Sequence, residues 1–273
     1  MSTLKSIARD WLPPAIVRAI QHVRGGSISF HGNYSTWDEA INQCTGYDAE
    51  QILSKVLEAT IRVKSGEAAY ERDSVEFDRI EYAWPITAGL MWSAAQNGGR
   101  MDVLDFGGAL GSSYFQNRFF LAELSQVRWS VIEQSHYVEA GRKYIEDDRL
   151  RFYKTIDECL LERQPNVLVF SSVLQYLSEP IKILNNLLDL NFEYLLIDRT
   201  PILNEQLSAL IKVQCVPASI YSASYPCWFF EYREFVGNIE NFGFKLIEEF
   251  YSLDKLSDIA TWRGFIFKRS VNQ

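Results

Sequence analysis

The stretch "DVLDFGGALGSSYFQ", Asp102 to Gln116, decides the fold of this chain. Its first part is apolar enough for a buried strand, and its last part has the composition of a helix. Between the two stand Gly107, Gly108 and Gly111, which allow the tight backbone turn that joins a strand directly to a helix. Such a turn is typical of a βαβ unit that binds a ligand above the carboxyl end of its first strand.

The flanking sequence extends this unit into a doubly wound α/β sheet. Strand-like and helix-like segments alternate, and a right-handed crossover through each helix makes neighbouring strands parallel. Strands are expected at 101–106, 128–134, 150–153, 166–172, 192–198, 244–251 and 262–269, and helices at 113–124, 137–145, 156–163, 179–190 and 231–243. The last two strands have no helix between them and must be antiparallel. A mostly parallel sheet with an antiparallel final strand is the plan of class I Rossmann-like methyltransferases, whereas nicotinamide-binding domains continue with parallel units.

The chain is expected to divide into two regions. Residues 99–273 are expected to form the core, and residues 1–98 a helical N-terminal extension and cap, with Gly66 ending one of its helices. The long segment before the helix at 231–243 is expected to be irregular because it contains Pro201, Pro217 and Pro226.

The glycine spacing distinguishes between ligands for the turn. A dinucleotide fold needs G-x-G-x-x-G, and the residues from Gly107 onward do not match it. The methyltransferase pattern Asp-x-Gly-x-Gly-x-Gly matches at Asp105, Gly107 and Gly111, while Ala109 stands at the position of the middle glycine. The turn therefore favours S-adenosylmethionine, which carries an ammonium group and a sulfonium instead of phosphates.

Two acids support this interpretation. Asp105 at the end of the first strand can attract the ammonium group, while small neighbours such as Gly108 let the backbone pass close to the ligand. Glu133, at the end of the next strand, can accept both ribose hydroxyl groups, with Gln134 beside it. The alternative is that both acids only cap the helices that follow them.

Further candidates for cofactor binding follow from the fold. Ser171 and Ser172 end the fourth strand, which in this fold lies beside the transferred methyl group. Arg72, in the charged "YERDSVEF", can pair with the methionine carboxylate. The alternative for Arg72 is a solvated charged face.

The chain also resembles a known family, through "GEAAYERDSVEF", "LDFGGALGSSYFQNR", "RWSVIEQSH", "FSSVLQYLSEP", "LLIDRTP" and "VQCVPASIYSASYPCWFF". It is similar to a largely uncharacterised bacterial family of S-adenosylmethionine-dependent methyltransferases associated with cell-surface polysaccharide biosynthesis. The resemblance covers about Phe30 to Arg269. It implies a methyltransferase fold, S-adenosylmethionine as cofactor and an acceptor among small molecules or glycan precursors.

Methylation of a hydroxyl group requires a base near the acceptor. Asp198 in "IDRTP" is the leading candidate, because it ends the fifth strand at the rim where open α/β sheets bind ligands. Glu231 is the second candidate, and His31 is the third, as part of an N-terminal lid. The alternatives are a local ion pair for Asp198 with Arg199 and an ordinary loop position for His31. The aromatic "IYSASYPCWFFEY" can line an acceptor pocket or pack in the core.

Composition excludes several classes of function. The net charge of -8 disfavours nucleic acid as a partner. The 4 cysteines show no C-x-x-C pair, and His, Cys and carboxylates are not clustered at ligand spacing, so no metal is expected and a reducing cytoplasm fits best. Residues 1–24 are basic, with an apolar stripe at helical spacing, which fits either peripheral contact with the inner face of a membrane or packing on the protein itself.

Two other functions stay open. Ala109 and the lack of an evident base are compatible with a non-catalytic, methyltransferase-like binding subunit of a glycan-synthesis complex. A nicotinamide-dependent sugar oxidoreductase is disfavoured by the glycine spacing and by the absence of a Tyr-x-x-x-Lys pair. The sequence leaves the acceptor and the oligomeric state undetermined.

Overall fold

The computed structural model describes residues 28–46, 49–72, 75–205, 208–217, 223–254 and 257–270. The amphipathic stretch expected at residues 1–24 lies outside these ranges. In the described part, no helix is long and apolar enough to cross a membrane.

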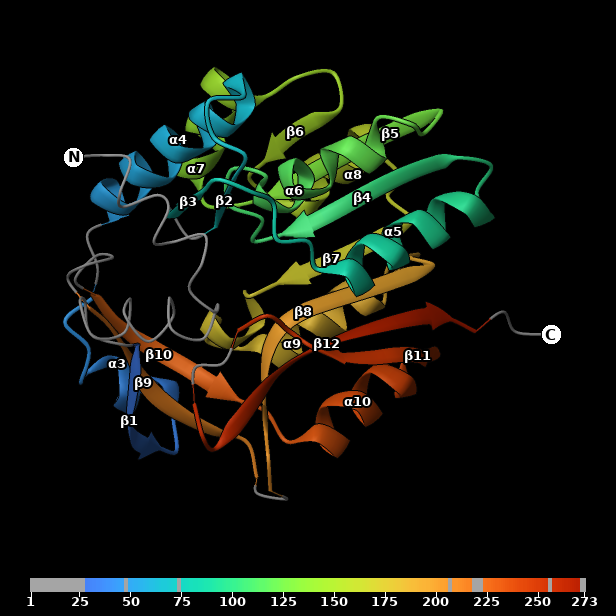
Figure 1. The fold of residues 1–273 in the computed structure, drawn as a ribbon. Coiled ribbons are helices and arrows are strands. Elements are labelled where there is room, and N and C mark those ends of the chain that lie inside the picture. The colour runs from blue at the N-terminus through green and yellow to red at the C-terminus, as the bar shows by residue number, and fades with distance from the viewer. Residues whose placement is uncertain are drawn as a thin grey trace, which may run out of the picture.

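A seven-stranded sheet forms the centre of the molecule (Figure 1). Its spatial order is β6-β5-β4-β7-β8-β12-β11. These strands are β4 (Arg100–Phe106), β5 (Gln126–Ile132), β6 (Leu150–Tyr153), β7 (Val167–Ser171), β8 (Tyr194–Leu203), β11 (Phe244–Tyr251) and β12 (Ala260–Arg269). β4 pairs in parallel with β5 and β7, and β12 is antiparallel to both of its neighbours, β8 and β11. The mostly parallel class I Rossmann-like sheet with an antiparallel final strand is thus confirmed.

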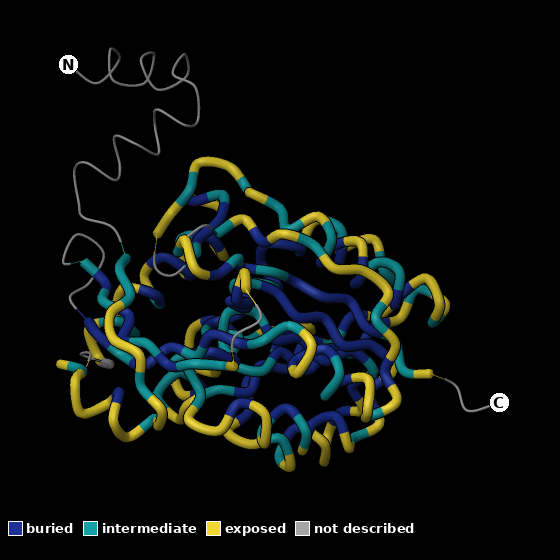
Figure 2. The backbone as a smooth tube through the Cα atoms, turned by 90° about the horizontal axis from the view of Figure 1, so that it is seen from below, coloured by how far each residue is buried: buried dark blue, intermediate teal, exposed yellow. Residues whose placement is uncertain are grey.

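Helices cover both faces of this sheet, so its strands are buried on both sides. The helices are α3 (Trp37–Ile41), α4 (Ala49–Ser65), α5 (Trp84–Gln96), α6 (Ser112–Leu121), α7 (Ser135–Ala140), α8 (Ile156–Glu162), α9 (Pro180–Leu188) and α10 (Tyr232–Asn241), with a π-helical turn η1 (Gly141–Ile145) and a 3₁₀ turn η2 (Leu174–Tyr176). Val103 packs in one core cluster with residues of α4, α5 and α6, while its neighbour Leu104 packs in the other with residues of α8, α9 and α10. Figure 2 shows the buried backbone in the interior and exposed residues around it.

Local sequence signals account for several helix ends. Thr36 and Glu39 form a reciprocal capping box that begins α3. Thr155 accepts a hydrogen bond from the backbone N–H of Glu158 and begins α8. The predicted stop at Gly66 is confirmed, because α4 ends at Ser65 and Gly66 has a φ of +84°.

A second sheet was not expected from the sequence. The segment with Pro201, Pro217 and Pro226 was predicted to be irregular, but it continues β8 and then forms β9 (Leu210–Val216) and β10 (Ala223–Phe229). β9 pairs on one side with β10 and on the other with β1 (Ser29–Tyr34), which adds an edge strand from a distant part of the chain. Proline is tolerated here because Pro226 lies on an edge strand.

The second sheet is anchored to the end of the central one by aromatic side chains. The rings of Phe30 and Phe229 meet edge to face at 5.2 Å, and both contact Trp262 of β12 at 5.7 and 5.9 Å. The N-terminal region also contains a hairpin of β2 (Tyr70–Arg72) and β3 (Val75–Phe77) besides its helices. The division at residue 98 and the cap both stay predictions.

Candidate functional site

The turn after β4 is shaped by glycines at positions where a side chain would not fit. Gly107 has a φ of +70°, and a Cβ there would lie 2.3 Å from Cγ2 of Val173. A Cβ on Gly108 would lie 2.5 Å from the Asp105 carboxyl group. Gly111, with a φ of +91°, begins α6. Ala109 also has a positive φ, +50°, so it adopts the left-handed conformation that a glycine would take at this position.

Left-handed backbone occurs just after two central strands and within a third. In the described ranges, Ala109, Ser172 and Arg199 are the residues other than glycine with a positive φ. They lie at the ends of β4 and β7 and within β8, next to one another in the sheet. Because such conformations persist where surrounding structure enforces them, their clustering marks this edge as a functional site.

Glu133 joins the ends of β4 and β5. Its carboxylate accepts a hydrogen bond from the backbone N–H of Gln134 at 2.7 Å, and the backbone N–H of Ala109 also faces it. Burial raises the pKa of Glu133, and these two N–H groups oppose the shift. The acid and the turn that were predicted separately therefore lie side by side.

Asp105 lies behind the turn. It is fully buried, and its Oδ2 accepts a hydrogen bond from Trp129 Nε1 at 3.0 Å. Its Oδ1 has no hydrogen-bond partner among the described residues. Burial raises the pKa of Asp105 to about 7, and the hydrogen bond from Trp129 acts in the opposite direction.

A cavity of about 1450 Å³ opens at this edge of the sheet. The ends of four parallel strands contribute to its lining, and we call them the strand-end rim: Ala109, Glu133, Lys154 and Ser172. Of the other predicted cofactor residues, Gly107, Gln134 and Arg72 also line this cavity. Asp105, Gly108, Gly111 and Ser171 do not, and Asp105 and Gly108 instead support the turn from behind.

A smaller cavity of about 30 Å³ adjoins Asp198 and Ser171. Asp198 accepts hydrogen bonds from Ser252 Oγ at 2.7 Å and from the backbone N–H of Arg199 at 2.8 Å. Burial raises the pKa of Asp198, while these hydrogen bonds and the Arg199 charge oppose the shift. Arg72 lines both cavities.

An aspartate links two arginines beside these cavities. Asp254 Oδ1 lies 3.7 Å from Arg72 Nη2, and its Oδ2 lies 3.9 Å from Arg199 Nη1. All three side chains are largely buried. Arg72 thus does not belong to a solvated charged face, which was the alternative to its predicted role; a largely buried ion pair holds its guanidinium group at the cavity wall.

The other two base candidates lie elsewhere. His31 is exposed on β1, where Ser29 Oγ lies 2.9 Å from its Nε2, and it does not line the cavity. Glu231 caps α10 by accepting a hydrogen bond from the backbone N–H of Glu234 at 2.7 Å. The structure therefore places both residues outside the lining of the cavity, and their roles as bases stay predictions.

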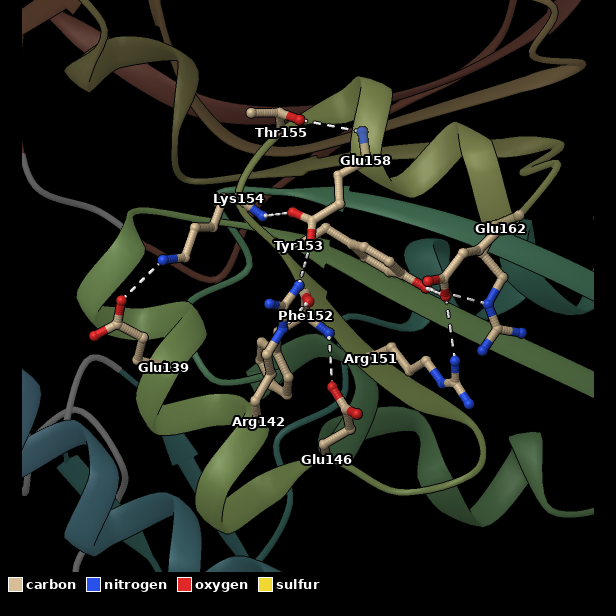
Figure 3. A network of polar contacts seen from close by, with 11 residues as sticks. Glu139, Arg142, Glu146, Arg151, Phe152, Tyr153, Lys154, Thr155, Glu158 and Glu162 are labelled. Carbon is tan, nitrogen blue, oxygen red and sulfur yellow. Dashed lines mark hydrogen bonds and ion pairs between the residues drawn. The ribbon is translucent and has the colours of Figure 1, made fainter.

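Two groups of cavity residues were missed by sequence reasoning. Lys154 and Thr155 follow β6, and Figure 3 shows Lys154 directed toward Glu139, with its Nζ 2.8 Å from Oε1. The rule that located Glu133 at the end of one parallel strand could have located these residues at the end of the next. The second group, which includes Trp37 and Gln214, comes from α3 and β9, which no local signal revealed, whereas Tyr225 belongs to the aromatic segment that was expected to line an acceptor pocket.

In the described part of the chain, no group of three or more His, Cys, Asp or Glu side chains is arranged to hold a metal ion.

Comparisons with known proteins gave only distant likenesses. No protein-family model matches the sequence, and no curated protein matches it. The N-terminal domain of EvdMO1 with SAH bound is 12% identical, with a TM-score of 0.49, over 82% of this chain and 98% of that one. Magnesium protoporphyrin IX methyltransferase (ChlM) from Synechocystis PCC 6803 with bound SAM is 11% identical, with a TM-score of 0.45, over 79% and 97%. The glycopeptide N-methyltransferase MtfA complexed with sinefungin is 12% identical, with a TM-score of 0.45, over 68% and 87%. The class I Rossmann-like assignment itself rests on the strand order and pairing of this chain.

Proposed function

We propose that this protein is an S-adenosylmethionine-dependent methyltransferase that acts on a small molecule or a glycan precursor. The observation that carries the proposal is the contact between the Ala109 turn and Glu133 on the wall of the large cavity. It combines the two sequence signals for this cofactor at the carboxyl ends of the adjacent parallel strands β4 and β5 in a doubly wound sheet. The family resemblance adds to this proposal a role in surface polysaccharide synthesis.

The described residues fit S-adenosylmethionine chemically. Glu133 would accept the ribose hydroxyl groups, and Arg72 would pair with the methionine carboxylate. The partnerless Oδ1 of Asp105 lies behind the turn, where a nearby ammonium group would favour the ionised carboxylate. Glu133, Arg72 and Asp105 thus offer one anionic, one cationic and one buried acidic group to S-adenosylmethionine, whose methionine part is zwitterionic and which carries a ribose.

When bound, the cofactor supplies an activated methyl group for an acceptor oxygen or nitrogen. The contribution of the chain is to position both reactants and to exclude water from the cavity. Asp198 stays our candidate base, because burial raises its pKa and so makes the carboxylate a stronger proton acceptor. Its small cavity adjoins the large one through Arg72.

The binding-subunit alternative rested on Ala109 and on the lack of an evident base, for which Asp198 is our candidate. In the structure, the left-handed backbone at Ala109 still directs its N–H to Glu133, as a glycine would allow. The departure from the glycine pattern therefore leaves the local contact intact, and we favour the enzyme.

Isothermal titration calorimetry with S-adenosylhomocysteine tests the proposal. We expect binding by the wild-type protein and a loss of at least about tenfold in Glu133→Gln, because an amide is a poorer acceptor for paired hydroxyl groups. Glu123→Gln, an exposed carboxylate just after α6, is the matched control and should bind as the wild type does. Failure of the folded wild type to bind, or binding of reduced nicotinamide instead, would refute the proposal.

A further inference from the structure

The lining of the large cavity divides by charge. The charged side chains among its described lining residues are Arg72, Glu133, Lys154, Asp157 and Asp254, all from the strand-end rim or segments beside it. The described residues that η2, α3, β9, β10 and β12 contribute carry no charge. We call this second part the neutral wall and define it by Trp37, Tyr176, Gln214, Ser224, Tyr225 and Trp262.

An amide between two phenols forms the polar centre of the neutral wall. Gln214 is only 2% exposed, and its Oε1 accepts a hydrogen bond from the Tyr176 hydroxyl at 3.1 Å. Its Nε2 donates to the Tyr225 hydroxyl at 3.2 Å. The two tyrosine rings meet edge to face at 5.2 Å. Pairing of Tyr225 with Gln214 across β9 and β10 sets this arrangement, so the polar groups are held in place before a ligand enters.

A second polar pair is fixed in the same way. Ser224 Oγ accepts a hydrogen bond from the backbone N–H of Thr45 at 2.7 Å and lies 2.9 Å from Thr45 Oγ1. The neutral wall therefore combines hydroxyl and amide groups with the aromatic side chains of Trp37 and Trp262.

This chemistry suits a neutral ligand. Aromatic faces pack against the C–H faces of a ring, while amide and hydroxyl groups form hydrogen bonds with its hydroxyls. A phosphate, carboxylate or ammonium group buried here would lose its hydration without a charged partner, which costs several kcal/mol.

We propose that the neutral wall binds the acceptor as an uncharged, hydroxylated ring of the sugar type, with any phosphate-bearing portion held away from it. The inference rests on the proposed function, since it gives the large cavity a charged cofactor half and an uncharged acceptor half. Tyr176, Gln214 and Tyr225 are then the residues that determine acceptor specificity.

Saturation-transfer NMR with four ligands of the same ring tests this inference. The probes are methyl α-glucopyranoside, glucose 1-phosphate, glucuronic acid and glucosamine, each measured with and without S-adenosylhomocysteine. We expect the saturation-transfer signal of the neutral glucoside to exceed that of each charged analogue on the order of tenfold, because burying an unpaired charge is costly.

Conservative variants localise the binding. Tyr176→Phe and Tyr225→Phe each remove one hydroxyl group and should reduce transfer to the glucoside severalfold, without changing the affinity for S-adenosylhomocysteine. Tyr144→Phe, at an exposed tyrosine on η1, is the control and should leave both unchanged.

Three results would overturn the inference: no transfer to the neutral ring, equal or stronger transfer to a charged analogue, or unchanged transfer in both Tyr→Phe variants. The cofactor titration on the same samples keeps the two proposals separate. Loss of S-adenosylhomocysteine binding with intact glucoside transfer would refute the methyltransferase proposal and leave the neutral wall standing as a ring-binding site. Binding of S-adenosylhomocysteine without a saturation-transfer signal from the glucoside would refute the neutral wall as a ring-binding site and leave the methyltransferase proposal standing.

Discussion

The strand-end rim and the neutral wall face the same cavity but are built in opposite ways. Each rim residue stands within three residues of the end of a parallel strand, so its place follows from the local order of strand, turn and helix. The neutral wall is assembled from distant parts of the chain, since Gln214 of β9 accepts a hydrogen bond from Tyr176 of η2 and Trp37 comes from α3. The difference shows that charge chemistry and local signals coincide in the rim, whereas the wall depends on long-range contacts.

The largest effect is expected from a change in the anchor of the neutral wall. Phe229→Ala removes a fully buried ring that contacts Phe30 and Trp262, and should lower the free energy of unfolding by about 3–5 kcal/mol. Urea unfolding measures this change. The affinity of the folded fraction for S-adenosylhomocysteine should stay within a small factor of the wild type, because the rim is built separately.

Phe119→Ala is the control for this change, because Phe119 is 67% exposed. It should alter stability by no more than about 0.5 kcal/mol. If Phe229→Ala abolishes cofactor binding in protein that is still folded, the wall and the rim are not independent.

A change in the rim turn should come next in size. Gly107→Ala places a Cβ 2.3 Å from Val173 Cγ2 at a φ of +70°, and should cost about 3 kcal/mol through overpacking and backbone strain. Chemical denaturation measures the loss. Gly98→Ala, at a φ of +63° with open space around it, isolates the backbone part and should cost about 1–2 kcal/mol. Equal losses in the two variants would show that close packing does not shape the turn.

The buried acid of the rim should make stability depend on pH. The pKa of Asp105 is raised to about 7 from an ordinary value of 3.8, so its stabilising effect is complete below pH 3.8 and is lost as the pH rises through 7. Relative to Asp105→Asn, the wild type should therefore lose about 2–3 kcal/mol between pH 5 and pH 8. Urea unfolding of both proteins at the two pH values measures the difference.

Asp157→Asn, an exposed carboxylate on the same cavity, should follow the wild-type pH profile and serves as the control. A profile of Asp105→Asn that also follows the wild type would contradict the assignment of this pH dependence to Asp105.

The smallest effect is expected from a change at Ala109, which stands where the methyltransferase pattern has a glycine. Ala109→Gly relieves the left-handed strain at a φ of +50° but adds chain entropy to the unfolded state, so we expect a net gain of about 0.5–1 kcal/mol. Thermal unfolding detects it, and cofactor affinity should not change. Ala122→Gly, at an ordinary helical φ of -63°, should instead lose about 0.5–1 kcal/mol. A loss in both variants would mean that Ala109 is not strained.

The features that depend on local sequence were predicted better than those that depend on contacts between distant segments. The expected helices at 156–163 and 231–243 and the strand at 150–153 are present as α8, α10 and β6. Glu133 and the turn at Gly107 were predicted to adjoin one ligand, and both line the cavity. His31 was expected in an N-terminal lid but lies in β1, whose pairing with the distant β9 no local pattern indicates.

The sequence alone determined the order of strands and helices in the central sheet, the glycine turn and the acids at the strand ends, because periodicity, glycine and strand-end position act over a few residues. Only the tertiary structure decided that Asp105 lies behind the turn and Glu133 on the cavity, since exposure depends on which side chains pack over each group. It alone also formed the neutral wall, in which Gln214 joins Tyr176 of η2 to Tyr225 of β10. Backbone hydrogen bonds between distant strands fix such contacts, and a single strand carries too little information to name its partner.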